Sequence, residues 1–215
     1  MAINNLIGQI PDHLSSLSNL EYLNLGVKNL TESILAWIGN FFSLYVLDLC
    51  LDNLQGSLPT KLGSLSCLGI FQLYGNNLSG TIPPQIYNIF SIYNFFVTQN
   101  QLHGSLPLDV GLTLSNLQTF AGNVNNFTGT IPVSLSNASQ LQALDFAQNG
   151  LTGTMPQNLN FDNNRLRNGK DGVLNFLSFL VNCTILEVLG LRDNYFGAEL
   201  HSQYFNPAKK VNHRC

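Results

Sequence analysis

Four histidines and four cysteines are the side chains of this 215-residue chain that are best suited to nucleophilic or metal-binding chemistry. They are His13, His103, His201 and His213, and Cys50, Cys67, Cys183 and Cys215. No C-x-x-C pair, no Cys/His set with zinc-ligand spacing and no G-x-S-x-G segment occurs. The sequence therefore predicts no enzyme, no metal site and no cofactor, and we expect Cys67 and Cys183 to be small core residues.

The sequence contains few charged residues, and this limits the classes of partner that it can bind. Charged residues make up 10% of the chain and the net charge is −3. The one basic cluster, Lys209, Lys210 and Arg214, lies in the last residues, where it is typical of a solvated end. Because phosphate backbones are bound by extended basic surfaces, we expect no nucleic-acid partner.

Apolar content is high, at 45% of residues, which favours a packed core. The first residues show no basic flank followed by an apolar run, so they do not resemble a secretory signal. The most apolar stretch, residues 34–51, contains Asn40, Ser43 and Asp48. It does not fit a membrane span, so we expect no direct membrane insertion by this chain.

A phrase of the form N-x-L-x-G-x-I-P recurs along the chain. Its copies begin at positions 4, 28, 52, 76, 100, 125 and 149, so every step is 24 residues except one of 25. Upstream of the copies runs the pattern L-x-x-L-x-x-L-x-L, as in Leu17, Leu20, Leu23 and Leu25. This regularity predicts stacked repeats, because one unit cannot bury its apolar face alone.

Each L-x-L segment is predicted to be a short strand whose leucines face the core and whose intervening residues face outward. Stacking places these strands in one parallel sheet at a spacing of about 4.8 Å. The predicted fold class is therefore an α/β solenoid with a concave parallel β-sheet and an irregular or short-helical convex side.

A polar residue opens each copy of the phrase, where the chain turns sharply and leaves backbone groups inside the turn. An asparagine side chain offers these groups both a donor and an acceptor, so a row of asparagines can satisfy successive turns. We name this row the Asn ladder, and it comprises Asn4, Asp52, Asn76, Asn100, Asn125, Asn149, Asn164 and Asn194. An ionised Asp52 supplies only the acceptor, and Lys28 supplies none, so we expect a looser turn there.

The repeat pattern sets the predicted domain boundaries. Residues 1–200 form one domain of about eight repeats, which is irregular at 157–185, and residues 201–215 form a tail without leucine register. In the irregular stretch, the spacing of Leu174, Phe176, Leu177 and Leu180 suits a short amphipathic helix on the convex side.

The full phrase, L-x-x-L-x-L-x-x-N-x-L-x-G-x-I-P, resembles plant-specific leucine-rich repeats over about residues 3–200. Residues 160–191 resemble one subgroup closely, the ectodomains of plant immune receptor kinases. This subgroup includes the bacterial flagellin and elongation-factor receptors and the rice blight-resistance receptor. No kinase Gly-rich loop, H-R-D-type loop or D-F-G segment occurs in the chain, so no kinase chemistry is carried over.

The resemblance implies defence-type recognition of a peptide or protein ligand, with a co-receptor as a further partner. In the parent family this takes place at the extracellular face of the plasma membrane. Two alternatives remain open. One is a soluble protein similar to the plant inhibitors of fungal polygalacturonases, or a decoy. The other is a truncated gene product without independent function.

Outward strand residues are the ligand surface that a solenoid offers by default. The candidates are Tyr22, Asn24, Asp48, Gln72, Tyr74, Asn94, Phe96, Thr98, Asp145 and Arg192. Tyr74 and Phe96 are expected to be exposed aromatic anchors near the centre of the surface. Five N-x-S/T sequons mark glycosylation candidates, namely Asn29, Asn77, Asn126, Asn137 and Asn182.

Overall fold

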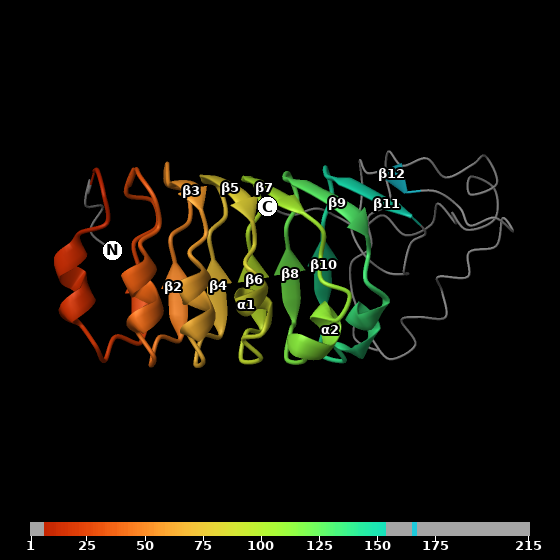
Figure 1. Cartoon of the computed structure of the whole chain (residues 1–215), viewed down its shortest axis with the longest axis horizontal. Coiled ribbons are helices and arrows are strands. Elements are labelled where there is room, and N and C mark those ends of the chain that lie inside the picture. The colour runs from red at the N-terminus through yellow and green to blue at the C-terminus, as the bar shows by residue number, and fades with distance from the viewer. Residues whose placement is uncertain (1–6, 154–164, 167–215) are drawn as a thin grey trace, which may run out of the picture.

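The computed structural model describes residues 7–153 and the short strand at residues 165–166. In this part the chain winds into a stack of coils along one axis, with two parallel sheets along its length (Figure 1). The predicted solenoid with one parallel sheet and a short-helical side is confirmed. The second parallel sheet was not predicted.

The main sheet holds the predicted L-x-L strands, in the order β1-β2-β4-β6-β8-β10. Its strands are β1 (Tyr22–Asn24), β2 (Val46–Asp48), β4 (Ile70–Gln72), β6 (Asn94–Phe96), β8 (Thr119–Ala121) and β10 (Ala143–Asp145). In every strand the middle residue is buried, as the alternation of the sequence predicts.

The second sheet is formed by the residues that follow each turn of the Asn ladder, in the order β12-β11-β9-β7-β5-β3. Its strands are β3 (Gln55–Ser57), β5 (Asn77–Thr81), β7 (Gln101–Gly104), β9 (Asn126–Thr130), β11 (Gly150–Gly153) and β12 (Arg165–Leu166). Proline follows β3, β5 and β9 within two residues. Because proline has no N–H to donate to a sheet, it helps to end these strands.

Short helices complete each coil before the next main strand. They are η1 (Asp12–Ser16), η2 (Ala36–Asn40), η3 (Thr60–Ser64), α1 (Pro84–Tyr87), α2 (Val110–Thr113) and η4 (Val133–Asn137). The single 25-residue step is absorbed in the coil of α2, since β6 and β8 still pair with Phe95 opposite Phe120. No helix in the described ranges has the length and apolar content that a membrane span requires.

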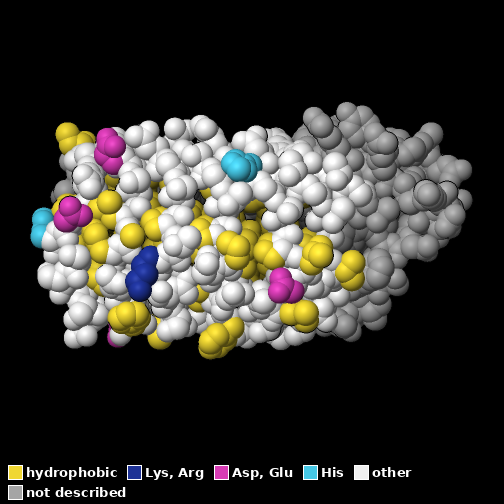
Figure 2. Space-filling model, viewed as in Figure 1, with side chains coloured by type: hydrophobic (Ala, Val, Ile, Leu, Met, Phe, Trp, Pro, Cys, Tyr) yellow, Lys and Arg dark blue, Asp and Glu magenta, His cyan; other side chains and the backbone are white. Residues whose placement is uncertain are grey.

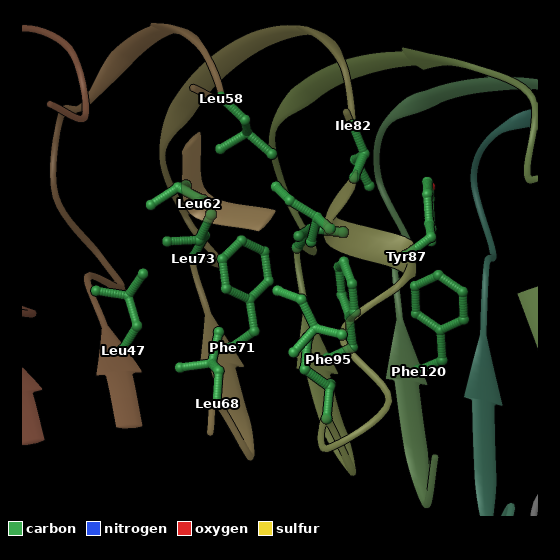
Figure 3. Close-up of a cluster of buried hydrophobic side chains, with 14 of the residues drawn as sticks. Leu47, Leu58, Leu62, Leu68, Phe71, Leu73, Ile82, Tyr87, Phe95 and Phe120 are labelled. Carbon is green, nitrogen blue, oxygen red and sulfur yellow. The ribbon is translucent and has the colours of Figure 1, made fainter. Parts of the chain in front are cut away.

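Buried side chains from successive coils form one continuous core (Figure 3). Phe71, Phe95 and Phe120 stand at the middle positions of neighbouring main strands, with ring centroids 5.0 and 4.9 Å apart. Tyr87 from α1 stacks on Phe95 at 6.0 Å, and burial raises the pKa of its phenol. Full burial of each such ring contributes about 1.5–3 kcal/mol, so the coils stabilise one another through this column.

The Asn ladder holds the turns after the main strands. The side-chain oxygen of Asn100 accepts from the backbone N–H of Leu78, 3.0 Å away in the preceding coil. Its side-chain nitrogen donates at 3.1 Å to the carbonyls of Leu73 and Val97. Asn76, Asn125 and Asn149 make equivalent bonds. The predicted ladder is therefore confirmed for these four, whereas Asn4, Asn164 and Asn194 lie outside the residues with described side chains.

Asp52 occupies the equivalent position in the ladder but makes only the accepting hydrogen bonds. One carboxylate oxygen accepts from the backbone N–H groups of Lys28 and Leu30, at 2.8 and 3.0 Å. The other oxygen is buried without a hydrogen-bond partner. This agrees with the prediction that an aspartate supplies only the acceptor half.

The repeat that begins at Lys28 has an unusual backbone. Glu32 takes the place that glycine holds in the other copies and has a φ of 70°. Asn29 also has a positive φ, 60°, which the equivalent residues Asn53, Asn77 and Asn126 do not. Asparagine tolerates a positive φ better than most residues, but for Glu32 it is costly, so this turn carries local strain. Whether it is looser, as the sequence predicts, stays a prediction.

Candidate ligand-binding face

The outward face of the main sheet carries two rows of side chains that run across its strands. The row at the first strand position consists of Tyr22, Val46, Ile70, Asn94, Thr119 and Ala143. The row at the third position consists of Asn24, Asp48, Gln72, Phe96, Ala121 and Asp145. Neighbouring members of a row are about 4.8 Å apart, since they are register partners in a parallel sheet.

Most of the predicted surface residues lie on these two rows. They are Tyr22, Asn24, Asp48, Gln72, Asn94, Phe96 and Asp145. Tyr74 and Thr98 lie two residues past the ends of β4 and β6, where Thr98 donates a hydrogen bond to the side chain of Asn123. Arg192 lies outside the described residues.

Several members of the rows were not among the predicted surface residues. They are Val46, Ile70, Thr119, Ala121 and Ala143, and all are half-buried. The alternation of inward and outward residues in the L-x-L strands places them on the outward face, as it does Asp48. Their small or aliphatic side chains did not mark them as ligand contacts.

The two aspartates of the third-position row are held by the turn that follows each strand. One carboxylate oxygen of Asp48 accepts from the backbone N–H of Cys50 at 3.2 Å, and Asp145 accepts from Ala147 at 3.0 Å. The second oxygen of Asp48 accepts from the side chain of Asn24 at 3.0 Å. These donors to Asp48 are neutral and fix its orientation without cancelling its charge.

Three tyrosines line the edge of the main sheet at which its strands begin. The rings of Tyr22 and Tyr45 meet edge to face with centroids 6.1 Å apart, and those of Tyr45 and Tyr93 are 6.2 Å apart. Between the last two lies Gly69, where an added Cβ would come within 2.6 Å of Tyr93 and 2.8 Å of Tyr45. Glycine at this position therefore lets the two rings approach each other across an intervening strand.

The hydroxyls of the same pair are joined by a hydrogen bond, and the oxygens of Tyr45 and Tyr93 lie 3.1 Å apart. This hydrogen bond and, secondarily, burial raise the pKa of the Tyr93 phenol to about 12. The sequence prediction missed Tyr45 and Tyr93 because they precede the L-x-L strand. Only the register, which places position 45 opposite position 93 across Gly69, could have paired them.

Two side chains differ from the sequence prediction in their exposure. Tyr74 and Phe96 are half-buried rather than exposed. Burial, and then contact with Cys50, raise the pKa of the Tyr74 phenol. Cys67 is exposed, so its prediction as a core residue is wrong: it lies between the helix and the strand of its coil, whereas Cys50 is buried. Cys183 lies outside the described residues.

The outward face of the second sheet is chemically different. On β3, β5, β7, β9 and β11 its outward side chains are Gln55, Ser57, Asn77, Ser79, Thr81, Gln101, His103, Asn126, Thr128, Thr130 and Thr152. None of them is Asp, Glu, Lys or Arg. Figure 2, viewed as Figure 1, shows a mostly uncharged surface over these strands. The acidic and aromatic side chains of the sheets are thus concentrated on the main sheet.

Four predicted glycosylation sites have exposed side chains, namely Asn29, Asn77, Asn126 and Asn137. Asn77 and Asn126 open strands β5 and β9 of the second sheet, and Asn137 ends η4. Asn29 follows the turn after β1, and Asn182 lies outside the described residues. Within the described ranges, no three His, Cys, Asp or Glu side chains are grouped as a metal site would require.

Two parallel sheets joined by short helices, with an asparagine in most of the described turns, define a leucine-rich-repeat solenoid. Comparisons with protein-family models and with curated proteins found no significant match. Solved structures do match. A TDR receptor structure is 34% identical with a TM-score of 0.80, and the match covers 90% of this chain and 34% of that one.

Two further structures extend the comparison. The ectodomain of the Arabidopsis receptor kinase HAESA, solved with an IDA peptide hormone ligand, is 26% identical with a TM-score of 0.56, over 90% of this chain and 41% of that one. A plant ice-binding protein is 25% identical with a TM-score of 0.72, over 90% of this chain and 62% of that one. The chain is similar in sequence and fold to plant leucine-rich-repeat receptor ectodomains, and it spans about a third of the length of the TDR receptor structure.

Proposed function

We propose that this chain is a ligand-recognition segment of a plant receptor ectodomain and that it binds a peptide or protein on the outward face of its main sheet. The observation that carries the proposal is the composition of this face. Tyr22, Ile70 and Phe96 offer apolar area, and Asp48 and Asp145 add charge. A surface that combines aromatic anchors with fixed polar groups is typical of recognition sites.

The glycosylation candidates support the same choice of face. Sugars on Asn77, Asn126 or Asn137 would cover the second sheet and the end of η4 and would leave the main sheet open. Glycosylation requires a secreted parent, and the similar receptors support an extracellular location for this segment.

The finer role that we propose is defence-type recognition, with a co-receptor as an additional partner. Support for a defence role comes from the resemblance of residues 160–191 to immune receptors. Structures such as HAESA with its peptide hormone support peptide binding in general. The chain itself would contribute recognition rather than catalysis.

The test is selection of ligands from a random dodecapeptide phage library on the immobilised full chain. Selected peptides are then measured against Phe96→Ser, which alters the proposed face. Phe90→Ser is the matched control, because Phe90 lies in the same repeat, is 61% exposed and follows α1 on the other side of the coil. Circular dichroism verifies that both variants keep their fold.

We expect Phe96→Ser to lower the affinity for the selected peptides by about tenfold, which corresponds to roughly 1.4 kcal/mol of binding free energy. Phe90→Ser should leave this affinity unchanged. Peptides that respond to Phe90→Ser but not to Phe96→Ser, or a failure to select any peptide, would contradict the proposed function.

A second candidate function is binding of ice by the second sheet. The similarity to a plant ice-binding protein and the uncharged polar surface of β5, β7 and β9 favour it. The test is inhibition of ice recrystallisation by the unglycosylated chain. Under this function, Thr81→Lys and Thr130→Lys abolish the inhibition and Phe96→Ser does not. A wild-type chain without inhibition excludes this candidate.

A further inference from the structure

The part of the main sheet formed by β1, β2, β4 and β6 has a composition that selects among peptide ligands. We call it the acidic tyrosine patch, and it consists of Glu21, Tyr22, Tyr45, Asp48 and Tyr93. Tyr22 and Tyr45 are 62% and 39% exposed. Glu21 directly precedes β1, and Asp48 ends β2. Phe96 lies on β6, two strands from Asp48 in the same row.

The charged side chains of this patch, Glu21 and Asp48, are both acidic. No Lys or Arg occurs on the six strands of the main sheet or at the residue that precedes each of them. The two hydrogen-bond donors to Asp48, Asn24 and Cys50, are neutral. A ligand with a positive charge therefore meets carboxylates here without displacing a resident cation, and a ligand with a negative charge is repelled.

The tyrosines add a second preference for a cation. A guanidinium or ammonium group is attracted to the face of an aromatic ring, and arginine uses this contact most often. Tyr45 is fixed on one side by Tyr22 and on the other by its hydrogen bond to Tyr93. Because these rings are already ordered, a cation that binds them loses little additional side-chain entropy.

An apolar position lies at a defined distance from the patch. The register partner of Phe96 on β8 is Ala121, whose single methyl group leaves space beside the ring. From β2 to β6 there are two strand spacings, about 10 Å in all. An extended peptide advances about 3.3 Å per residue, so this distance corresponds to about three residues.

We infer that the ligand of this face is an extended peptide with an arginine or lysine three residues from a large apolar side chain. The basic group lies over Tyr22 and Tyr45 next to Asp48, and the apolar group lies against Phe96. The inference rests on the proposed function and names the chemistry of its ligand.

The same phage selection supplies the first test. We expect the selected sequences to be enriched in Arg or Lys three positions from Leu, Ile, Phe or Trp. Fluorescent peptides with the spacing Arg-Ser-Gly-Leu are then compared with peptides in which Glu replaces Arg, or in which Arg directly precedes Leu. The measurement is fluorescence anisotropy on the unmodified full chain, so it does not depend on whether a variant folds.

We expect the Glu peptide to bind about tenfold more weakly and the adjacent-spacing peptide about threefold more weakly, from the usual size of exposed cation–π and ion-pair contacts. Binding of the Arg peptide weakens at high salt. A charge reversal sharpens the test, since Asp48→Lys should reduce the preference for the Arg peptide over the Glu peptide. Asp109→Lys, at an exposed position just before α2, should not change this preference.

The outcomes separate the inference from the proposed function. Peptides that depend on Phe96 but show no basic preference overturn the inference and leave the proposed function in place. Peptides that do not depend on Phe96 overturn both. Equal binding of the Arg and Glu peptides to the unmodified chain also overturns the inference.

Discussion

The turn after β1 and the turns after β4, β6 and β8 occupy the same place in the repeat but are built from different side chains. In the later turns Asn76, Asn100 and Asn125 bridge two coils with both halves of their amide groups. Near the N-terminus Lys28 replaces the asparagine and Glu32 replaces the glycine, and Asp52 leaves a buried oxygen without a partner. The repeat thus tolerates imperfect turns because core packing from neighbouring coils maintains the stack.

Removal of a complete asparagine should give the largest effect. Asn125→Ala leaves the backbone N–H of Leu102 and the carbonyls of Val97 and Gly122 without their side-chain partner. We expect the free energy of unfolding to fall by about 2–3 kcal/mol, measured by urea denaturation. The neighbouring exposed Asn126 is the matched control, and Asn126→Ala should change stability by less than about 0.5 kcal/mol. Equal losses would show that the ladder register is wrong.

Substitutions at the glycine position of the repeat should change the free energy of unfolding in opposite directions in the two regions. Gly80 has a φ of 79° and an added Cβ would lie 3.3 Å from Ser57, so Gly80→Ala should destabilise the fold by about 1–2 kcal/mol. Glu32 has a φ of 70° at the equivalent place. Glu32→Gly should stabilise by about 0.5–1 kcal/mol, because relief of strain exceeds the entropy cost of glycine. Destabilisation by both changes in urea denaturation would contradict this account.

Completing the ladder at its defective position should give a smaller gain. Asp52→Asn retains the acceptor for Lys28 and Leu30 and replaces the unpartnered oxygen with a donor. We expect a gain of about 1 kcal/mol, measured as a higher urea midpoint at unchanged m-value. The reverse change, Asn76→Asp, should destabilise the fold. If Asp52→Asn were destabilising, the unpartnered carboxylate oxygen of Asp52 would have a role other than in the turn.

The smallest effect on stability should come from the exposed polar contact between Tyr45 and Tyr93. Its hydrogen bond raises the pKa of Tyr93 to about 12. A raised pKa favours the folded state below about pH 10, and this contribution is lost as the pH rises toward 12. Tyr45→Phe should shift the ionisation of Tyr93 to lower pH in an ultraviolet titration and change stability at pH 7 only slightly. An unchanged titration would show that the hydroxyls do not interact in solution.

The sequence by itself determined the stack, the main sheet and the ladder. A 24-residue period, with alternation inside L-x-L, leaves one way to bury the leucines, so Leu47, Phe71 and Phe95 had to face inward together. The same argument predicted the turn bonds of Asn76 and the missing half of those bonds at Asp52, because the hydrogen-bonding capacity of a side chain is fixed by its type.

The tertiary structure decided what depends on contacts between repeats. The second sheet has no strong apolar alternation of its own, and its strands form because each coil offers hydrogen-bonding partners to the next. The tyrosine contacts require the register that brings Tyr45 to Tyr93 over Gly69, which lie in three different coils. The half-buried state of Tyr74 and Phe96 likewise depends on the size of side chains one strand away. A sequence pattern states which way a residue faces, but its exposure and its partners are set by neighbours 24 residues away on either side.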